Sequence, residues 1–135
     1  MPVTHTIDRA ERIVRLTVTG ALSIDEMRRT VDAVVAETEG EGGFCVLSDH
    51  RGLSTPSTPA QLEALVEYMH IAGPPFHRAR WAVVTSNPAS YGMMRLLMVI
   101  AERVPILVNV FEDMESAEHW LRTSRETVGA LEDAH

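Results

Sequence analysis

Short apolar runs of strand length alternate with longer segments of helical period, and this alternation constrains the fold of the chain most strongly. The runs at 44–47, 80–84 and 106–111 have the length and composition of buried strands, and a helical segment follows each. Strands that alternate with helices predict right-handed crossovers and a largely parallel sheet. Two β-prone runs near the start, 3–8 and 13–19, flank a polar turn, so we expect an antiparallel edge strand.

Four segments of helical period begin at residues that commonly cap helices. These residues are Ser23, Thr58, Asn87 and Asp113. The signal is complete at Thr58, because Pro59 occupies the first helical position and Gln61 can return a hydrogen bond to the cap. The sequence therefore predicts a single-domain α/β sandwich of order ββαβαβαβα over residues 1–125. A polar C-terminal tail is expected at 126–135.

Composition and motifs argue against several classes of function. The 135 residues carry 12 Lys and Arg against 19 Asp and Glu, a formal net charge of −7, which argues against nucleic acid binding. The longest wholly apolar stretch, 96–101, is too short to span a membrane, and 1–16 lacks the apolar core of a signal peptide. The lone Cys45 cannot form an intramolecular disulfide, so we expect a cytoplasmic protein with a buried thiol. The histidines lack metal-ligand spacing, and we expect no metal and no cofactor.

Asp49, His50 and Arg51 form the densest polar cluster, at the carboxyl end of a strand that we expect to be central in the sheet. Ligands of open α/β sheets gather at such ends. Three interpretations are open: a structural role with Arg51 in an ion pair, contact with a ligand, or acid–base chemistry by Asp49 and His50. Neighbouring residues of a strand point to opposite faces, so Asp49 and His50 need not converge. The segment 50–58 is expected to be a long loop.

The third helix is unusual because Arg95 is the only charged residue between Pro88 and Ala101. A helix that is apolar on several faces is normally buried on more than one side, and methionines also suit an adaptable binding surface. Core packing, a homodimer face and the wall of an apolar ligand pocket all fit this pattern. The residues expected to bind a ligand or partner are Asp49, Arg51, Tyr91, Met94, Arg95 and Met98.

Four segments spread along the chain also form a recognisable series. They are 18–23, 46–53, 80–84 and 110–121. In this order they resemble the STAS-like domains, the family of anti-sigma-factor antagonists and of the cytoplasmic domains of sulfate transporters. The match is closest to the small stand-alone bacterial branch described as STAS-like or CRAL-TRIO-like. The resemblance implies a non-catalytic regulatory module that binds a protein partner or a small lipophilic or anionic ligand.

The sequence departs from that family at the site of its phosphorylation switch. Anti-sigma-factor antagonists carry an Asp followed by a phosphorylatable Ser at the start of the next helix, whereas Asp49 here precedes His50 and Arg51. Ser57 and Thr58 are the candidate phosphoacceptors, since phosphate is favourable at a helix N-terminus; the alternative is that they are a loop hydroxyl and a cap. Two other functions stay open. One is a hydrolase- or transferase-like enzyme using Asp49 and His50, and the other is a structural homodimer without a ligand.

Overall fold

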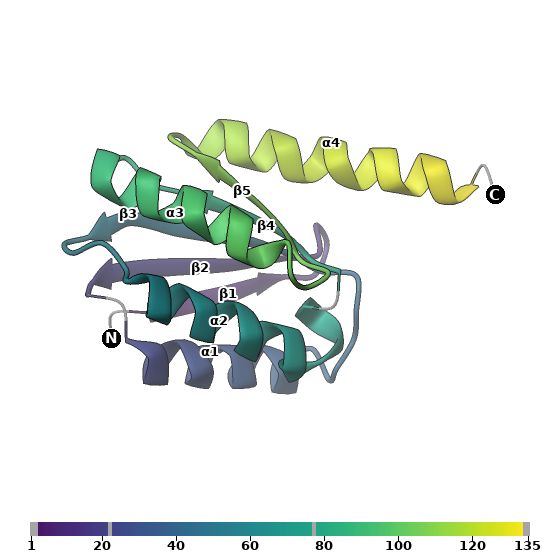
Figure 1. The fold of residues 1–135 in the computed structure, drawn as a ribbon. Helices are drawn as coiled ribbons and strands as arrows, with labels where there is room; N and C mark the ends of the chain where they lie inside the picture. The colour runs from purple at the N-terminus through teal and green to yellow at the C-terminus, as the bar shows by residue number, and fades with distance from the viewer. Residues whose placement is uncertain (1–2, 22, 77, 134–135) are drawn as a thin grey trace.

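The computed structural model describes residues 3–21, 23–76 and 78–133, which form a mixed sheet with helices on both faces (Figure 1). The elements are β1 Val3–Asp8, β2 Ile13–Gly20, α1 Ile24–Glu37, β3 Cys45–Leu53, α2 Pro59–Ala72, β4 Arg80–Val84, α3 Pro88–Ala101, β5 Leu107–Phe111 and α4 Met114–Asp133. A short 3₁₀ helix, Pro74–Phe76, links α2 to β4. The α/β class and the ββαβαβαβα order are confirmed.

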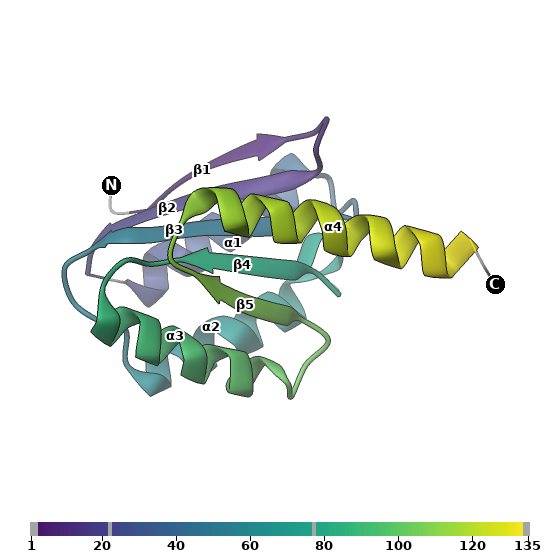
Figure 2. The same ribbon diagram turned by 90° about the horizontal axis from the view of Figure 1, so that it is seen from above.

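The strands lie in the sheet in the order of the chain, β1-β2-β3-β4-β5. β1 pairs antiparallel with β2 at one edge, and every other neighbouring pair is parallel. Right-handed crossovers that advance in one direction place their helices on one side, so α1, α2 and α3 cover the same face. α4 follows the last strand and crosses the opposite face (Figure 2). The mostly parallel sheet with an antiparallel edge strand is also confirmed.

A hydrophobic core lies on each face of the sheet. The larger core joins the sheet to α1, α2 and α3 and contains the fully buried Trp81, Phe76 and Met94. The smaller core lies under α4, where Leu121 packs among buried residues of β2, β3 and β4. The thiol of Cys45 is buried in this smaller core, as the apolar run around it indicated.

The helices begin at the residues that the sequence predicted as caps. The side chains of Ser23, Asn87 and Asp113 each accept a hydrogen bond from a backbone amide of the following helical turn. At α2 the full capping box forms, with 3.2 Å from the Gln61 amide to Thr58 Oγ1 and 2.8 Å from the Thr58 amide to Gln61 Oε1. Local signals therefore set the start of each helix.

β3 is longer than the apolar run from which it was predicted. The sequence favoured a strand at 44–47 and a loop at 50–58, but the strand continues to Leu53, which pairs with Gly20 of β2. The predicted loop boundary is therefore wrong. The hydrogen bonds of a parallel ladder are made by backbone groups. Pairing with β2 therefore extends β3 through polar residues, which a hydrophobic pattern does not predict as strand.

A β-bulge lies in this extension. Thr17 pairs with Asp49 and Thr19 pairs with Gly52, so two residues of β3 stand opposite one residue of β2. Gly52 directly follows the two bulged residues and lies close to β2. A Cβ at this position would lie 2.8 Å from Thr19 Cγ2, so the absence of a side chain allows the strands to approach. The bulge shifts the alternation of β3 by one residue, so that Leu53 lies in the larger core.

α4 continues into the segment 126–135 that was expected to be a polar tail. Its backbone is helical as far as Asp133, and residues 134–135 lie outside the described residues. The division into a domain at 1–125 and a separate tail stays a prediction.

Candidate functional site

The carboxyl ends of the parallel strands and the N-terminal ends of α1, α2 and α3 gather at one end of the molecule (Figure 1). Each helix runs back against the strand it follows, so the arrangement is a consequence of the crossovers. Of the residues predicted as a site, Asp49, Arg51, Ser57, Thr58 and Tyr91 lie near this end, whereas Met94, Arg95 and Met98 lie further along α3. The alternation of β3 decides which of them share a face.

Asp49 and Arg51 form a bidentate ion pair beside the bulge. The Nε and Nη2 atoms of Arg51 lie 2.9 Å and 2.8 Å from the two carboxylate oxygens of Asp49, and the Arg51 amide lies 3.1 Å from Oδ1. The hydrogen bond from the Arg51 side chain holds the pKa of Asp49 below its usual value. Arg51 is exposed, so the pair is solvated and free to meet a partner. The ion pair of Arg51 that the structural interpretation predicted is therefore present.

His50 points to the opposite face of β3 and is 1% exposed. Burial lowers the pKa of its imidazole to about 4, while the Coulombic attraction of Asp49 opposes the shift. The ring is therefore neutral at pH 7. Asp49 and His50 do not converge, so the acid–base pair that the enzyme hypothesis needs is not formed.

His50 is one of four buried polar side chains that belong to β3 or lie directly after β4 and directly before the cap of α2. Ser48 precedes it on the same face of β3, Thr85 directly follows β4, and Ser57 directly precedes the cap of α2. Ser48 Oγ, both ring nitrogens of His50, Ser57 Oγ and Thr85 Oγ1 have no hydrogen-bond partner among the described residues. We call these four residues the buried polar cluster. In the sequence, only the i, i+2 spacing of Ser48 and His50 indicates this cluster, because residues two apart on a strand share a face. The expectation that 50–58 is a loop hid this spacing.

The two candidate phosphoacceptors differ in accessibility. Ser57 is 2% exposed and belongs to the buried polar cluster. Thr58 is exposed and caps α2, whose first turn carries no acidic residue. A phosphate on Thr58 would therefore meet solvent and the positive end of the helix dipole without like-charge repulsion from that turn.

The predicted residues of α3 divide between the core and the surface. Met94 is fully buried in the larger core, which places it beyond reach of a surface-bound molecule. Tyr91 and Met98 are half-buried and pack against that core, and Arg95 is exposed. Asp49 lies on the face of β3 that looks toward α4, so the structure does not join it to Met94 in one cleft.

The comparisons with known proteins agree with this geometry. A sequence profile described as SpoIIAA-like matches residues 13–122, which is most of the chain. The chain belongs to the SpoIIAA-like family. The STAS-like resemblance seen in the sequence is thereby confirmed. No curated protein matches the sequence.

Two solved structures resemble this SpoIIAA-like domain. One is an uncharacterised protein with a SpoIIAA-like fold from Shewanella loihica, with 16% identity, a TM-score of 0.61 and coverage of 88% of this chain and 91% of that one. The other is an anti-sigma factor antagonist from Mycobacterium paratuberculosis, with 15% identity, a TM-score of 0.57 and coverage of 89% and 94%. At these identities the likeness establishes the fold.

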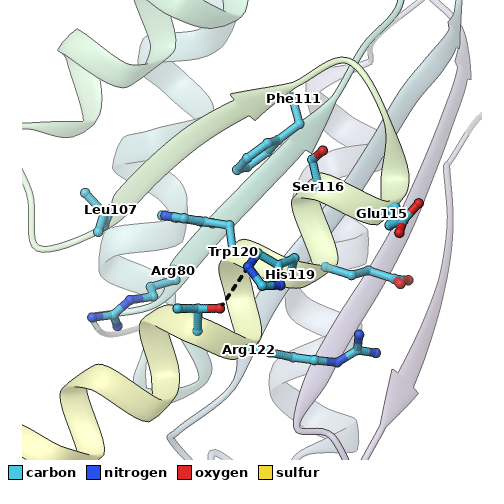
Figure 3. Close-up of a pocket in the computed structure, with 10 residues that line it drawn as sticks. Arg80, Leu107, Phe111, Glu115, Ser116, His119, Trp120 and Arg122 are labelled. Atoms are coloured by element: carbon cyan, nitrogen blue, oxygen red, sulfur yellow. Dashed lines mark hydrogen bonds between the residues drawn. The ribbon is translucent and has the colours of Figure 1, made fainter.

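A pocket lies on the other face of the SpoIIAA-like domain, between α4 and the edge formed by β4 and β5 (Figure 3). Its volume is about 790 Å³, within the range of small-molecule sites. Arg80, Leu107, Phe111 and Trp120 are among the residues that line it. None of the residues predicted as a site does so. No pattern in the sequence predicts this pocket, because its walls come from three elements that are separate in the chain.

Two further properties concern the described part of the SpoIIAA-like chain. No helix in it is long and apolar enough to cross a bilayer. No group of three or more His, Cys, Asp and Glu side chains there is arranged to hold a metal ion.

Proposed function

We propose that the chain is a non-catalytic regulatory module that binds a protein partner at the α2–α3 edge. We define this edge by four exposed or half-buried residues: Arg51 near the end of β3, Thr58 at the start of α2, Tyr91 in the first turn of α3 and Arg95 in the middle of α3. Family membership and the fold shared with an anti-sigma factor antagonist support this class of function. Tyrosine and arginine are also enriched among the residues that dominate the energy of protein interfaces.

The observation that carries the proposal is the start of α2. Thr58 is an exposed residue that caps a helix N-terminus, while the buried hydroxyl of the preceding Ser57 and the ring nitrogens of the buried His50 have no hydrogen-bond partner among the described residues. Buried polar atoms without partners cost stability, so a chain optimised for stability alone would carry apolar residues there. Their position near a helix start supports a site whose conformation or charge changes in use. We propose Thr58 as its phosphoacceptor.

The alternatives that involve α3 receive less support. Its apolar residues are mostly absorbed by the core, because Met94, Leu97 and Ile100 face the sheet and Val99 is its exposed large apolar residue. Core packing therefore accounts for the unusual composition of the helix. A homodimer through α3 and an apolar ligand beneath it stay predictions without an observation of their own.

The test is quantitative affinity purification of the tagged full chain from its own host. Arg95→Glu reverses a charge on the α2–α3 edge, and Thr58→Asp adds a charge while keeping an oxygen able to cap α2. The recovered amount of any protein that binds this edge is expected to fall at least about tenfold with either variant. The reason is that a repulsive charge buried in an interface costs several kcal/mol of binding free energy. Mass spectrometry of the same samples reports phosphate on Thr58.

Arg122→Glu is the matched control, because it reverses an exposed arginine on α4, on the other face of the sheet. Circular dichroism of each variant verifies that the fold is retained. A set of bound proteins that is the same for wild type and all three variants would contradict the proposal. Native mass spectrometry that finds a homodimer and no other protein would instead favour the structural dimer.

A further inference from the structure

The pocket beside α4 combines an aromatic wall with Arg80, which forms no ion pair with the residues that the structure describes. Arg80 begins β4 and pairs in register with Leu107 of β5, so both side chains leave the same face of the sheet. Phe111 ends β5 on that face, four residues after Leu107, and Trp120 reaches the pocket from α4 (Figure 3).

The apolar part of the pocket suits a flat ring. The rings of Phe111 and Trp120 lie 5.6 Å apart at 47°, a tilted pair that forms one wall. Leu107 is 56% exposed, an unusual exposure for a large apolar residue of a strand in this chain. A ring placed between Leu107 and Trp120 would remove both side chains from water.

The charged residues of the pocket favour an anion at the end near Arg80. Arg80 forms no ion pair with any described residue, and its buried Nε has no hydrogen-bond acceptor among them. Of the two glutamates, Glu118 is held by Arg15 at 2.8 Å. Glu115 lies toward the other end of the pocket, with Trp120 between it and Arg80 (Figure 3). A carboxylate beside Arg80 would match the planar guanidinium without meeting a free acidic group.

We propose that this pocket binds a small aromatic carboxylate, with its ring against Trp120 and Leu107 and its carboxylate on Arg80. The site lies on the face of the sheet opposite to α3 and shares no residue with the α2–α3 edge. The proposal therefore stands independently of the proposed function. It adds a ligand site to a module whose partner surface lies elsewhere.

The probes for the test are 2-naphthoate and its neutral counterpart 2-naphthamide, titrated into the full chain by isothermal calorimetry. The two molecules share the ring and differ in the charge that Arg80 recognises. We expect 2-naphthoate to bind about tenfold or more tightly than 2-naphthamide, as for a hydrogen bond to a charged group. In ¹H–¹⁵N spectra, 2-naphthoate is expected to shift the Trp120 indole signal and leave that of the core residue Trp81 in place.

Two variants with matched controls locate the binding. Arg80→Gln is expected to reduce the affinity for 2-naphthoate about tenfold and to abolish the difference between the probes, whereas Arg95→Gln on α3 changes neither. Leu107→Glu places a negative charge at the mouth of the pocket and is expected to remove 2-naphthoate binding. Val99→Glu is its control, because Val99 is 58% exposed against 56% for Leu107 but lies on α3.

Three results would overturn the proposal. One is equal affinity for 2-naphthoate and 2-naphthamide, and another is no saturable binding of either probe. The third is binding that survives both Arg80→Gln and Leu107→Glu in variants whose circular dichroism matches wild type. Such binding would lie at another surface.

Discussion

Acidification from pH 7.5 to pH 5 is expected to lower the free energy of unfolding by about 2 kcal/mol through one side chain, His50. Burial lowers the pKa of His50 to about 4 in the folded chain, against 6.5 for an unfolded histidine. Between these values the unfolded chain binds a proton that the folded chain does not. The stabilisation is therefore complete above pH 6.5 and is lost as the pH falls toward 4.

The size of the effect at pH 5 follows from the two pKa values. At that pH, protonation of His50 shifts the folding equilibrium toward the unfolded chain about thirtyfold, which corresponds to about 2 kcal/mol. The Asp49 carboxylate has a lowered pKa and stays ionised at pH 5, so its own contribution is not yet lost. Urea denaturation at both pH values, followed by the fluorescence of the buried Trp81, measures the change.

The comparison with His50→Leu isolates this residue from the other titratable groups. The variant removes the titration and replaces two buried, unpartnered nitrogens by apolar atoms. It is therefore expected to lose about 2 kcal/mol less than wild type on acidification and to be at least as stable at pH 7.5. His119→Gln removes an exposed histidine and serves as the control. A His50→Leu variant with the same pH dependence as wild type would refute the reasoning.

Three further changes test the fold near the candidate site by urea denaturation. Gly52→Ala is expected to cost about 1–3 kcal/mol because its Cβ meets Thr19, whereas Gly92→Ala, in open space on α3, is expected to stabilise by about 0.5–1 kcal/mol. Thr58→Ala breaks the capping box and is expected to cost about 1 kcal/mol, and Thr58→Ser is expected to keep most of that stability. A double-mutant cycle on Arg15 and Glu118 is expected to give a coupling of about 1 kcal/mol or less that weakens with salt, because both side chains are partly exposed.

The order of elements could be predicted because its signals are local. Thr58, Pro59 and Gln61 specify the start of α2 within four residues, and β4 follows from the apolar run at 80–84 with the same bounds. The period of hydrophobic residues then assigns each segment to a helix or a strand. A right-handed crossover rule is enough to place α1, α2 and α3 on one face.

The end of β3 could not be predicted in the same way. Arg51 and Gly52 are a polar and a small residue, which in the sequence predict a loop. They belong to a strand because the backbone of β2 pairs with β3 as far as Gly20. The bulge depends on the approach of Gly52 to Thr19, which are far apart in the chain. The opposite orientations of Asp49 and His50, by contrast, were foreseen from strand alternation alone.

The site residues were harder to predict, because exposure is decided by the whole fold. Met94 and Arg95 are neighbours on an apolar helix, yet the first is core and the second is surface. The aromatic pocket needs Arg80, Leu107 and Trp120 to meet at a sheet edge, and no spacing in the sequence encodes that meeting.

The two faces of the sheet differ in a way that bears on regulation. On the face covered by α4, the buried Nε of Arg80 has no hydrogen-bond partner among the described residues, whereas Ser48, His50, Ser57 and Thr85 each carry such an atom near the ends of β3 and β4 and the start of α2. Each unpartnered group lowers the free energy needed to open the structure locally, since water satisfies it in the open state. The buried polar cluster is therefore where we expect local opening of the structure to be favoured. Opening at the start of α2 would expose Ser57 next to Thr58, so a modification or a partner at this end would act on the same segment.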